Sequence, residues 1–182
     1  MRQVIIFSLD IEVELGMLQK KVCMLGSFAV GKTSLVRRFV ESIFSESYLT
    51  TVGVKVDKKV IRAGEQEVTM MLWDIAGHDG LQNLRMSYLN GASGLLLVAD
   101  GTRRDTLAAA IAIREEAKIV AASAAFVLAI NKTDLAHDWE IDSQEENELV
   151  SRGWKVVRTS AKTGDGVERA FESLALAMLE ST

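Results

Sequence analysis

The stretch Gly26–Thr33, GSFAVGKT, matches the phosphate-loop pattern G-x-x-x-x-G-K-[ST] and constrains the fold more than any other part of the chain. The apolar run Lys21–Leu25 before it predicts a buried strand, and Thr33–Val40 after it carries apolar residues at helical spacing. A strand, a glycine loop and a helix N-terminus together form an anion cradle, because the loop N–H groups and the helix dipole face the same point. The alternative is a glycine turn that binds nothing.

The phosphate-loop pattern also assigns roles to side chains. Lys32 would reach the β- and γ-phosphates of a nucleotide, and the Thr33 hydroxyl would bind Mg²⁺. The other residues of the loop would contribute backbone N–H groups. The residues that we expect to hold the phosphates are Gly26, Ser27, Phe28, Ala29, Val30, Gly31, Lys32, Thr33 and Ser34.

The composition predicts a soluble globular protein. Of 182 residues, 48% are hydrophobic and 25% charged, and a net charge of −4 without a basic cluster argues against a nucleic-acid partner. The single cysteine, Cys23, excludes an internal disulfide and favours a reducing compartment such as the cytoplasm. No apolar run approaches the roughly 18 residues that span a bilayer. With Arg2 near the start and no cysteine in 179–182, we also expect no lipid anchor.

The chain divides into an N-terminal extension, residues 1–19, and one domain, residues 20–182. Within the extension, Ile11–Leu15 alternates apolar and acidic residues. That pattern fits a half-buried strand at a sheet edge, and it fits a loosely held arm equally well. The structure of the extension is therefore left open by the sequence.

Beyond the first helix, the sequence predicts a hairpin and then alternating strands and helices. The hairpin strands are Val54–Ile61 and Val68–Trp73, with a turn at Ala63–Glu65. The later strands are Gly94–Ala99, Ala125–Ile130 and Trp154–Val157, and the later helices are Thr102–Ala121, Ile141–Arg152 and Gly166–Leu179. This order predicts an α/β fold with a six-stranded, mostly parallel sheet, one antiparallel strand and about five flanking helices.

Polar residues follow several of the predicted strands. The phosphate loop ends one strand, Asp74 ends another, Asn131–Asp134 (NKTD) ends a third, and Ser160–Lys162 (SAK) follows a fourth. Any one of them could be local turn chemistry, because Asn, Asp and Ser often bond to the backbone at strand ends. In open α/β sheets, however, ligands gather at the carboxyl ends of the strands. The four together therefore predict one binding site.

At these residues the chain resembles the Ras superfamily of small GTPases, and the Rab branch most closely. The resemblance covers about residues 20 to 179 and includes Tyr48–Gly53 (YLTTVG) and Trp73–Gly77 (WDIAG) besides the motifs above. It implies the small G domain of the P-loop NTPases. It also implies a guanine-nucleotide switch that binds GTP or GDP with Mg²⁺ and hydrolyses GTP slowly.

The resemblance implies roles at the phosphate end of the site. Thr51 would bind Mg²⁺ and the γ-phosphate, Asp74 would hold Mg²⁺ through water, and the Gly77 amide would sense the γ-phosphate. The metal ligands would thus be Thr33, Thr51 and Asp74. The catalytic residues would be His78, Lys32, Thr51 and Gly77.

At the base end, the resemblance implies that Asn131 and Asp134 read the guanine edge and that the Lys132 stem lies along the base. The Ala161 amide would contact the guanine oxygen, between Ser160 and Lys162. An aromatic residue, Phe44, falls where the family places a ring beside the base.

The chain departs from the family pattern at three places. His78 stands where most members carry the glutamine that orients the attacking water, although translational GTPases also have histidine there. Phe28 and Ala29 replace small residues within the phosphate loop, and a phenyl ring there would crowd the γ-phosphate side. On the Rab switch surface Val56 stands where phenylalanine would be expected beside Trp73 and Tyr88.

Two other functions compete with a slow GTPase. One is a GTP-gated binding scaffold with little or no hydrolysis, which Phe28 would favour. The other is an ATP-using P-loop enzyme, against which Asn131 and Asp134 argue. For a nucleotide switch, the partners would be guanine nucleotide together with effector and regulator proteins, which would bind through the switch segments near 44–56 and 75–90.

Overall fold

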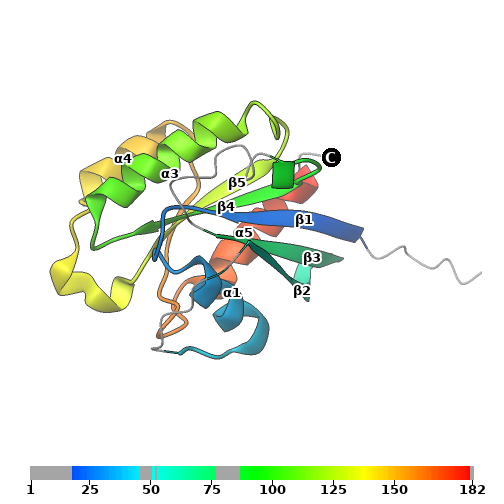
Figure 1. The fold of residues 1–182 in the computed structure, drawn as a ribbon, viewed down its shortest axis with the longest axis horizontal. Helices are drawn as coiled ribbons and strands as arrows, with labels where there is room; N and C mark the ends of the chain where they lie inside the picture. The colour runs from blue at the N-terminus through cyan, green and yellow to red at the C-terminus, as the bar shows by residue number, and fades with distance from the viewer. Residues whose placement is uncertain (1–17, 46–50, 52, 77–86, 181–182) are drawn as a thin grey trace, which may run out of the picture.

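The protein is a mixed sheet covered by helices on both faces (Figure 1). The computed structural model describes residues 18–45, 51, 53–76 and 87–180. The strands are β1 (Leu18–Leu25), β2 (Val54–Ala63), β3 (Gln66–Ile75), β4 (Gly94–Asp100), β5 (Ala125–Asn131) and β6 (Val156–Arg158). They form one six-stranded sheet in the order β2-β3-β1-β4-β5-β6. Only β2 and β3 pair antiparallel within the described sheet, which confirms the predicted hairpin and the mostly parallel arrangement.

Alternation along the central strands sends side chains to both faces of the sheet. In β1, Val22 and Met24 belong to one core cluster, whereas Cys23 and Leu25 belong to the other. Successive side chains of a strand point to opposite faces, so a strand between two helical layers must be apolar throughout. Every residue of β4 is buried accordingly.

The helices divide between the two faces. They are α1 (Lys32–Glu41), α3 (Arg104–Ala117), α4 (Ser143–Ser151) and α5 (Val167–Glu180), with a 3₁₀ helix η1 (Thr133–Asp138) after β5. One core cluster joins α1 and α5 to the sheet, and Phe39 stacks on Phe171 with ring centroids 3.9 Å apart. The other joins α3 and α4, which lie across the sheet from α1 in Figure 1. Among the described residues, no helix is long and apolar enough to cross a membrane.

Two expected element bounds were wrong, and one element was not expected. The helix expected at 102–121 is only Arg104–Ala117, because the Thr102 amide and hydroxyl bind the Asp100 carboxylate and hold a turn. The last strand does not begin at Trp154, whose amide donates to Leu149 and closes the preceding turn. The 3₁₀ helix η1 was not anticipated.

The parallel strands carry their polar ends to one edge of the sheet. Asp100 at the end of β4 lies in register with Asn131 at the end of β5, and β1 runs into the phosphate loop between β3 and β4. The expectations for the extension before residue 18 lie outside the described residues.

Candidate functional site

The phosphate loop approaches its neighbours too closely for side chains at its glycines. A Cβ at Gly26, where φ is +149°, would lie 2.3 Å from the Val98 carbonyl oxygen of β4. A Cβ at Gly31, where φ is +102°, would lie 2.3 Å from Asn131 Nδ2. Both positions therefore require glycine on steric and conformational grounds. The pattern glycines hold the loop against the ends of β4 and β5.

Lys32 begins α1 and extends its side chain across the mouth of the loop. Its Nζ donates to the carbonyls of Gly26 at 3.0 Å and Ser27 at 2.9 Å, and the residue is only 7% exposed. The ammonium is thus fixed beside the loop that the sequence predicts for phosphate. A mostly buried cation at a helix N-terminus makes the local potential favourable to anions.

Three oxygen atoms of the predicted metal ligands meet at the end of β3. The hydroxyls of Thr33 and Thr51 lie 2.7 Å apart, and both bind Asp74 Oδ2, at 2.6 and 3.0 Å. Asp74 is 1% exposed, and its buried Oδ1 has no hydrogen-bond partner among the described residues. Burial raises the pKa of Asp74, although hydrogen bonds from Thr33 and Thr51 act in the opposite direction.

This donor set fits Mg²⁺. The ion takes oxygen ligands in octahedral geometry at about 2.0–2.1 Å, so neighbouring ligand oxygens lie about 2.9 Å apart. The separation of the Thr33 and Thr51 hydroxyls is close to that spacing. The unpartnered Asp74 Oδ1 is an additional acceptor for a metal-bound water. No group of three or more His, Cys, Asp or Glu residues in the described part of the chain is arranged to hold a metal, so this would be a hydroxyl-rich site.

Asn131 joins the phosphate loop to the loop after β6. Its Nδ2 donates to the Val30 carbonyl at 3.0 Å, while its Oδ1 accepts from the Thr159 hydroxyl and the Ala161 amide, each at 3.2 Å. Asn131 is 2% exposed. Through this side chain the NKTD and SAK motifs are both tied to the phosphate loop.

Asp134 and the loop around Ser160 form the other half of the site. Asp134 Oδ1 accepts from the Ser160 hydroxyl at 2.6 Å. From α1, Arg38 donates to the carbonyls of Ala161, at 2.7 Å, and Lys162. The backbone of the SAK motif is thus fixed by a helix on one side and by the NKTD motif on the other.

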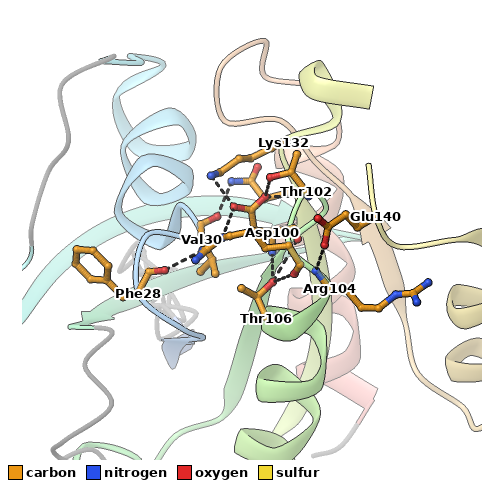
Figure 2. Close-up of polar contacts among 10 residues, drawn as sticks. Phe28, Val30, Asp100, Thr102, Arg104, Thr106, Lys132 and Glu140 are labelled. Atoms are coloured by element: carbon orange, nitrogen blue, oxygen red, sulfur yellow. Dashed lines mark hydrogen bonds and ion pairs between the residues drawn. The ribbon is translucent and has the colours of Figure 1, made fainter. Parts of the chain in front are cut away.

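A cluster that the sequence reasoning missed lies at the end of β4 (Figure 2). The Asp100 carboxylate is buried and accepts from Lys132 Nζ at 2.6 Å, from Arg103 Nε at 3.0 Å and from Thr102. Burial would raise the pKa of Asp100, but the hydrogen bonds from Lys132 and Thr102 outweigh it and the pKa is lowered. Its place at a strand end was the available signal, since the same reasoning had found Asp74 and Asn131.

Arg103 connects this cluster to the phosphate loop. Its Nη2 donates to the Phe28 carbonyl at 3.0 Å, and this carbonyl faces the network in Figure 2. The Phe28 residue is 45% exposed. Lys132, the other cation on Asp100, has a left-handed backbone with φ of 75° where β5 passes into η1.

Other predicted site residues are not brought to this cluster by any contact described above. Phe44 is partly buried and packs against the core cluster of α1 and α5, so its place beside a base stays a prediction. Ser34 lies in the first turn of α1. Gly77 and His78 lie outside the described residues.

Comparison with known proteins decides the family. A family model described as the Ras family matches residues 21–180. The chain belongs to the Ras family. It is 34% identical over 166 residues to the Ras-related protein Rab-4A of Homo sapiens, covering 87% of this chain and 74% of the relative. It is equally identical over the same length to the Ras-related protein Rab-4B of Homo sapiens, covering 76% of that relative.

Family membership confirms the main functional expectations. This Ras-family protein is a Rab-like small GTPase that binds GTP and GDP as a molecular switch. Its reaction is hydrolysis of GTP to GDP and phosphate. The sheet, the helices and the hairpin are those of the small G domain.

Proposed function

We propose that this GTPase binds Mg²⁺ and guanine nucleotide at the carboxyl ends of β1, β3, β5 and β6. The proposed domain is residues 20–182 preceded by the extension 1–19, of which Leu18 and Gln19 already pair with β3 as the start of β1. The observation that carries the proposal is the joining of the phosphate loop, the NKTD motif and the SAK motif through the single side chain of Asn131. A site for a base and a site for phosphates are thereby built as one unit.

At the phosphate end, the proposal assigns positioning and charge neutralisation to this chain's own groups. The loop amides, Ser34 and the Lys32 ammonium would hold the phosphates, and Thr33, Thr51 and Asp74 would hold Mg²⁺. Phosphoryl transfer needs little covalent help from the protein, so these groups supply most of what the reaction requires. When bound, Mg²⁺ adds positive charge next to the phosphate oxygens.

At the base end, Asp134 is proposed to select guanine by accepting hydrogen bonds from the ring N–H and the exocyclic amine. The Asp134→Asn variant puts a donor where guanine also donates, and a buried mismatch of this kind costs about 1–3 kcal/mol. We expect the affinity for guanine nucleotides to fall by roughly one to two decades and the affinity for xanthine nucleotides to rise. The measurement is competition of GTP and xanthosine triphosphate against a bound fluorescent GDP. Unchanged GTP affinity in the variant would remove Asp134 from the base site.

For hydrolysis, we propose that His78 orients the attacking water and that the Gly77 amide senses the γ-phosphate. The His78→Ala variant should then slow single-turnover hydrolysis by roughly 100-fold, the usual scale for a group that positions or moves a proton. A wild-type protein that binds GTP tightly but does not turn it over would instead support the scaffold function. If wild type hydrolyses GTP fast and His78→Ala hydrolyses it at the same rate, another residue must orient the attacking water.

The proposed partners are effector and regulator proteins that distinguish the GTP and GDP forms in the cytoplasm, through the segments near 44–56 and 75–90. Within the described part of these segments, Val56 is 43% exposed on β2 and faces Trp73 across the hairpin. The rings of Trp73 and Tyr88 lie 6.2 Å apart. Val56 stands where the Rab pattern has phenylalanine, so the partners of this surface need not be those of the Rab branch.

A further inference from the structure

The direction of one peptide group in the phosphate loop depends on a residue outside every recognised motif. Arg103, just before α3, donates through Nη2 to the Phe28 carbonyl at 3.0 Å and through Nε to Asp100 Oδ2 at 3.0 Å. Asp100 is itself buried and held by Lys132 and Thr102. The guanidinium therefore has a rigid support on one side and the phosphate loop on the other.

Fixing a carbonyl also fixes the next amide. The Phe28–Ala29 peptide bond is trans, and in a trans peptide the C=O and the N–H point to opposite sides. Since the Phe28 carbonyl points outward to Arg103, the Ala29 N–H points to the opposite side of the loop chain. Asn131 holds the Val30 carbonyl in the same way, which sets the Gly31 N–H.

The backbone at Ala29 makes this support necessary. Ala29 has φ of 59°, in the left-handed region that residues with a Cβ avoid. Turning the Phe28–Ala29 peptide over would change φ of Ala29 by about 180° and return it to the negative φ that residues with a Cβ prefer. The turned peptide would place the Phe28 carbonyl on the side of the loop where the Ala29 N–H now points. The Arg103 hydrogen bond opposes that turn, because it binds the carbonyl only in the present orientation.

We propose that Arg103 is a positioning residue for nucleotide binding, which keeps the Ala29 amide directed at the phosphates by holding the Phe28 carbonyl on its outer side. The inference rests on the proposed placement of phosphates in the Gly26–Thr33 loop. It assigns to Arg103 an effect on phosphate binding through the backbone, separate from recognition of the base by Asn131 and Asp134.

The test is the rate of GDP release from the Mg²⁺-bound protein. The Arg103→Ala variant should release GDP about tenfold faster than wild type, the change that corresponds to roughly 1.4 kcal/mol. The matched control is Arg104→Ala, which removes the same charge one residue away. Arg104 donates to Glu145 and has a side chain that is 57% exposed, and its variant should release GDP at the wild-type rate.

Two further readouts separate positioning of the amide from other roles. In ¹⁵N-labelled, GDP-bound protein the Ala29 amide resonance should move in Arg103→Ala, while that of Gly31, which Asn131 supports, should stay. Selectivity for GDP over inosine diphosphate, which lacks the exocyclic amine, should be unchanged. Equal GDP release in Arg103→Ala and wild type, an unmoved Ala29 resonance, or a lost preference for GDP would each overturn the inference. Failure of wild type to bind GDP would instead overturn the proposed phosphate site.

Discussion

At the scale of single residues, the site holds backbones and charges in states that cost free energy. Ala29 and Lys132 both have left-handed backbones, at φ of 59° and 75°. Such a conformation costs a residue with a Cβ about 1–2 kcal/mol, and a typical hydrogen bond contributes about 0.5–1.5 kcal/mol net. The solvent-exposed bond from Arg103 to Phe28 is thus comparable in size with the strain at Ala29 that it opposes.

The Ala29→Gly variant should weaken the dependence of the loop on Arg103. Glycine adopts the left-handed region without the Cβ penalty, so turning the peptide no longer relieves strain. We expect Arg103→Ala to accelerate GDP release about tenfold in the otherwise wild-type protein, but about threefold or less when it is combined with Ala29→Gly. The measurement is a double-mutant cycle of GDP release rates. An equal effect in both backgrounds would mean that Arg103 does not act through the strain at Ala29.

Asp100 should stabilise the fold as a carboxylate. Replacing it by Asn removes the buried acceptor of the Lys132 and Arg103 cations, whose own side chains are 27% and 40% exposed, and should lower the free energy of unfolding in urea by about 1–3 kcal/mol. Because the pKa of Asp100 is lowered, its contribution is complete above the pKa of an unfolded aspartate and is lost only as pH falls through the lower folded value.

The pH dependence gives a direct check of that assignment. The difference in unfolding free energy between wild type and Asp100→Asn should be constant from about pH 7.5 to about pH 5, since an ordinary aspartate has a pKa of about 3.9. A difference that narrows across this range would show that the carboxyl group titrates there and would contradict the ionised, hydrogen-bonded Asp100.

At the scale of secondary-structure elements, hydrophobic pattern and strand-end chemistry predicted most of the architecture. The apolar runs located β1, β4 and β5, and alternation with a glycine turn located the hairpin of β2 and β3. Local turn hydrogen bonds decided the element ends that were wrong, as where Thr102 binds Asp100 before α3 and the Trp154 amide donates to Leu149 before β6. A propensity pattern contains no information on such partners.

In the candidate site too, sequence patterns predicted some residues, whereas others depend on contacts that only the fold creates. The phosphate-loop pattern predicted Lys32, and the strand ends predicted Asp74 and Asn131, but no prediction was made for Asp100 at the end of β4. The bond from Arg103 to Phe28 joins residues 75 positions apart in the sequence, and it depends on how α3 sits beside the phosphate loop. No local pattern could have predicted it.

Contact between α1 and α5 should be essential for stability. Phe39 and Phe171 are fully buried and stacked, with an interplanar angle of 6°. The Phe39→Ala variant removes one ring from a closely packed core and should lower the free energy of unfolding by about 3–5 kcal/mol. Chemical denaturation of the nucleotide-free protein measures this. As a control, Ile119→Ala at a position 83% exposed should change it by less than about 0.5 kcal/mol. Equal changes in the free energy of unfolding for the two variants would show that the stacked pair does not contribute to the stability of the core.

At the scale of the whole molecule, nucleotide binding should stabilise the sheet as a unit. Cys23, the only cysteine, is fully buried in β1, and burial raises its pKa to about 11, so its thiol is both inaccessible and protonated near neutral pH. A thiol reagent should therefore label Cys23 only when the protein opens. Bound GDP at about 100 times its Kd should slow opening-limited labelling by roughly 100-fold. If Cys23 is labelled rapidly and at the same rate with and without GDP, nucleotide binding does not stabilise the sheet around Cys23.

The central claim is that one site at the carboxyl ends of the strands binds a nucleotide by its guanine base and by its phosphates together. The most direct measurement is equilibrium competition of GTP and ATP against fluorescent GDP bound to the wild-type protein with Mg²⁺. Because a site built to hydrogen-bond one base rejects another by about 10⁴-fold or more, GTP should displace the probe at concentrations at least that much lower than ATP. Displacement by ATP within about tenfold of GTP, a difference of only about 1.4 kcal/mol, would contradict the account.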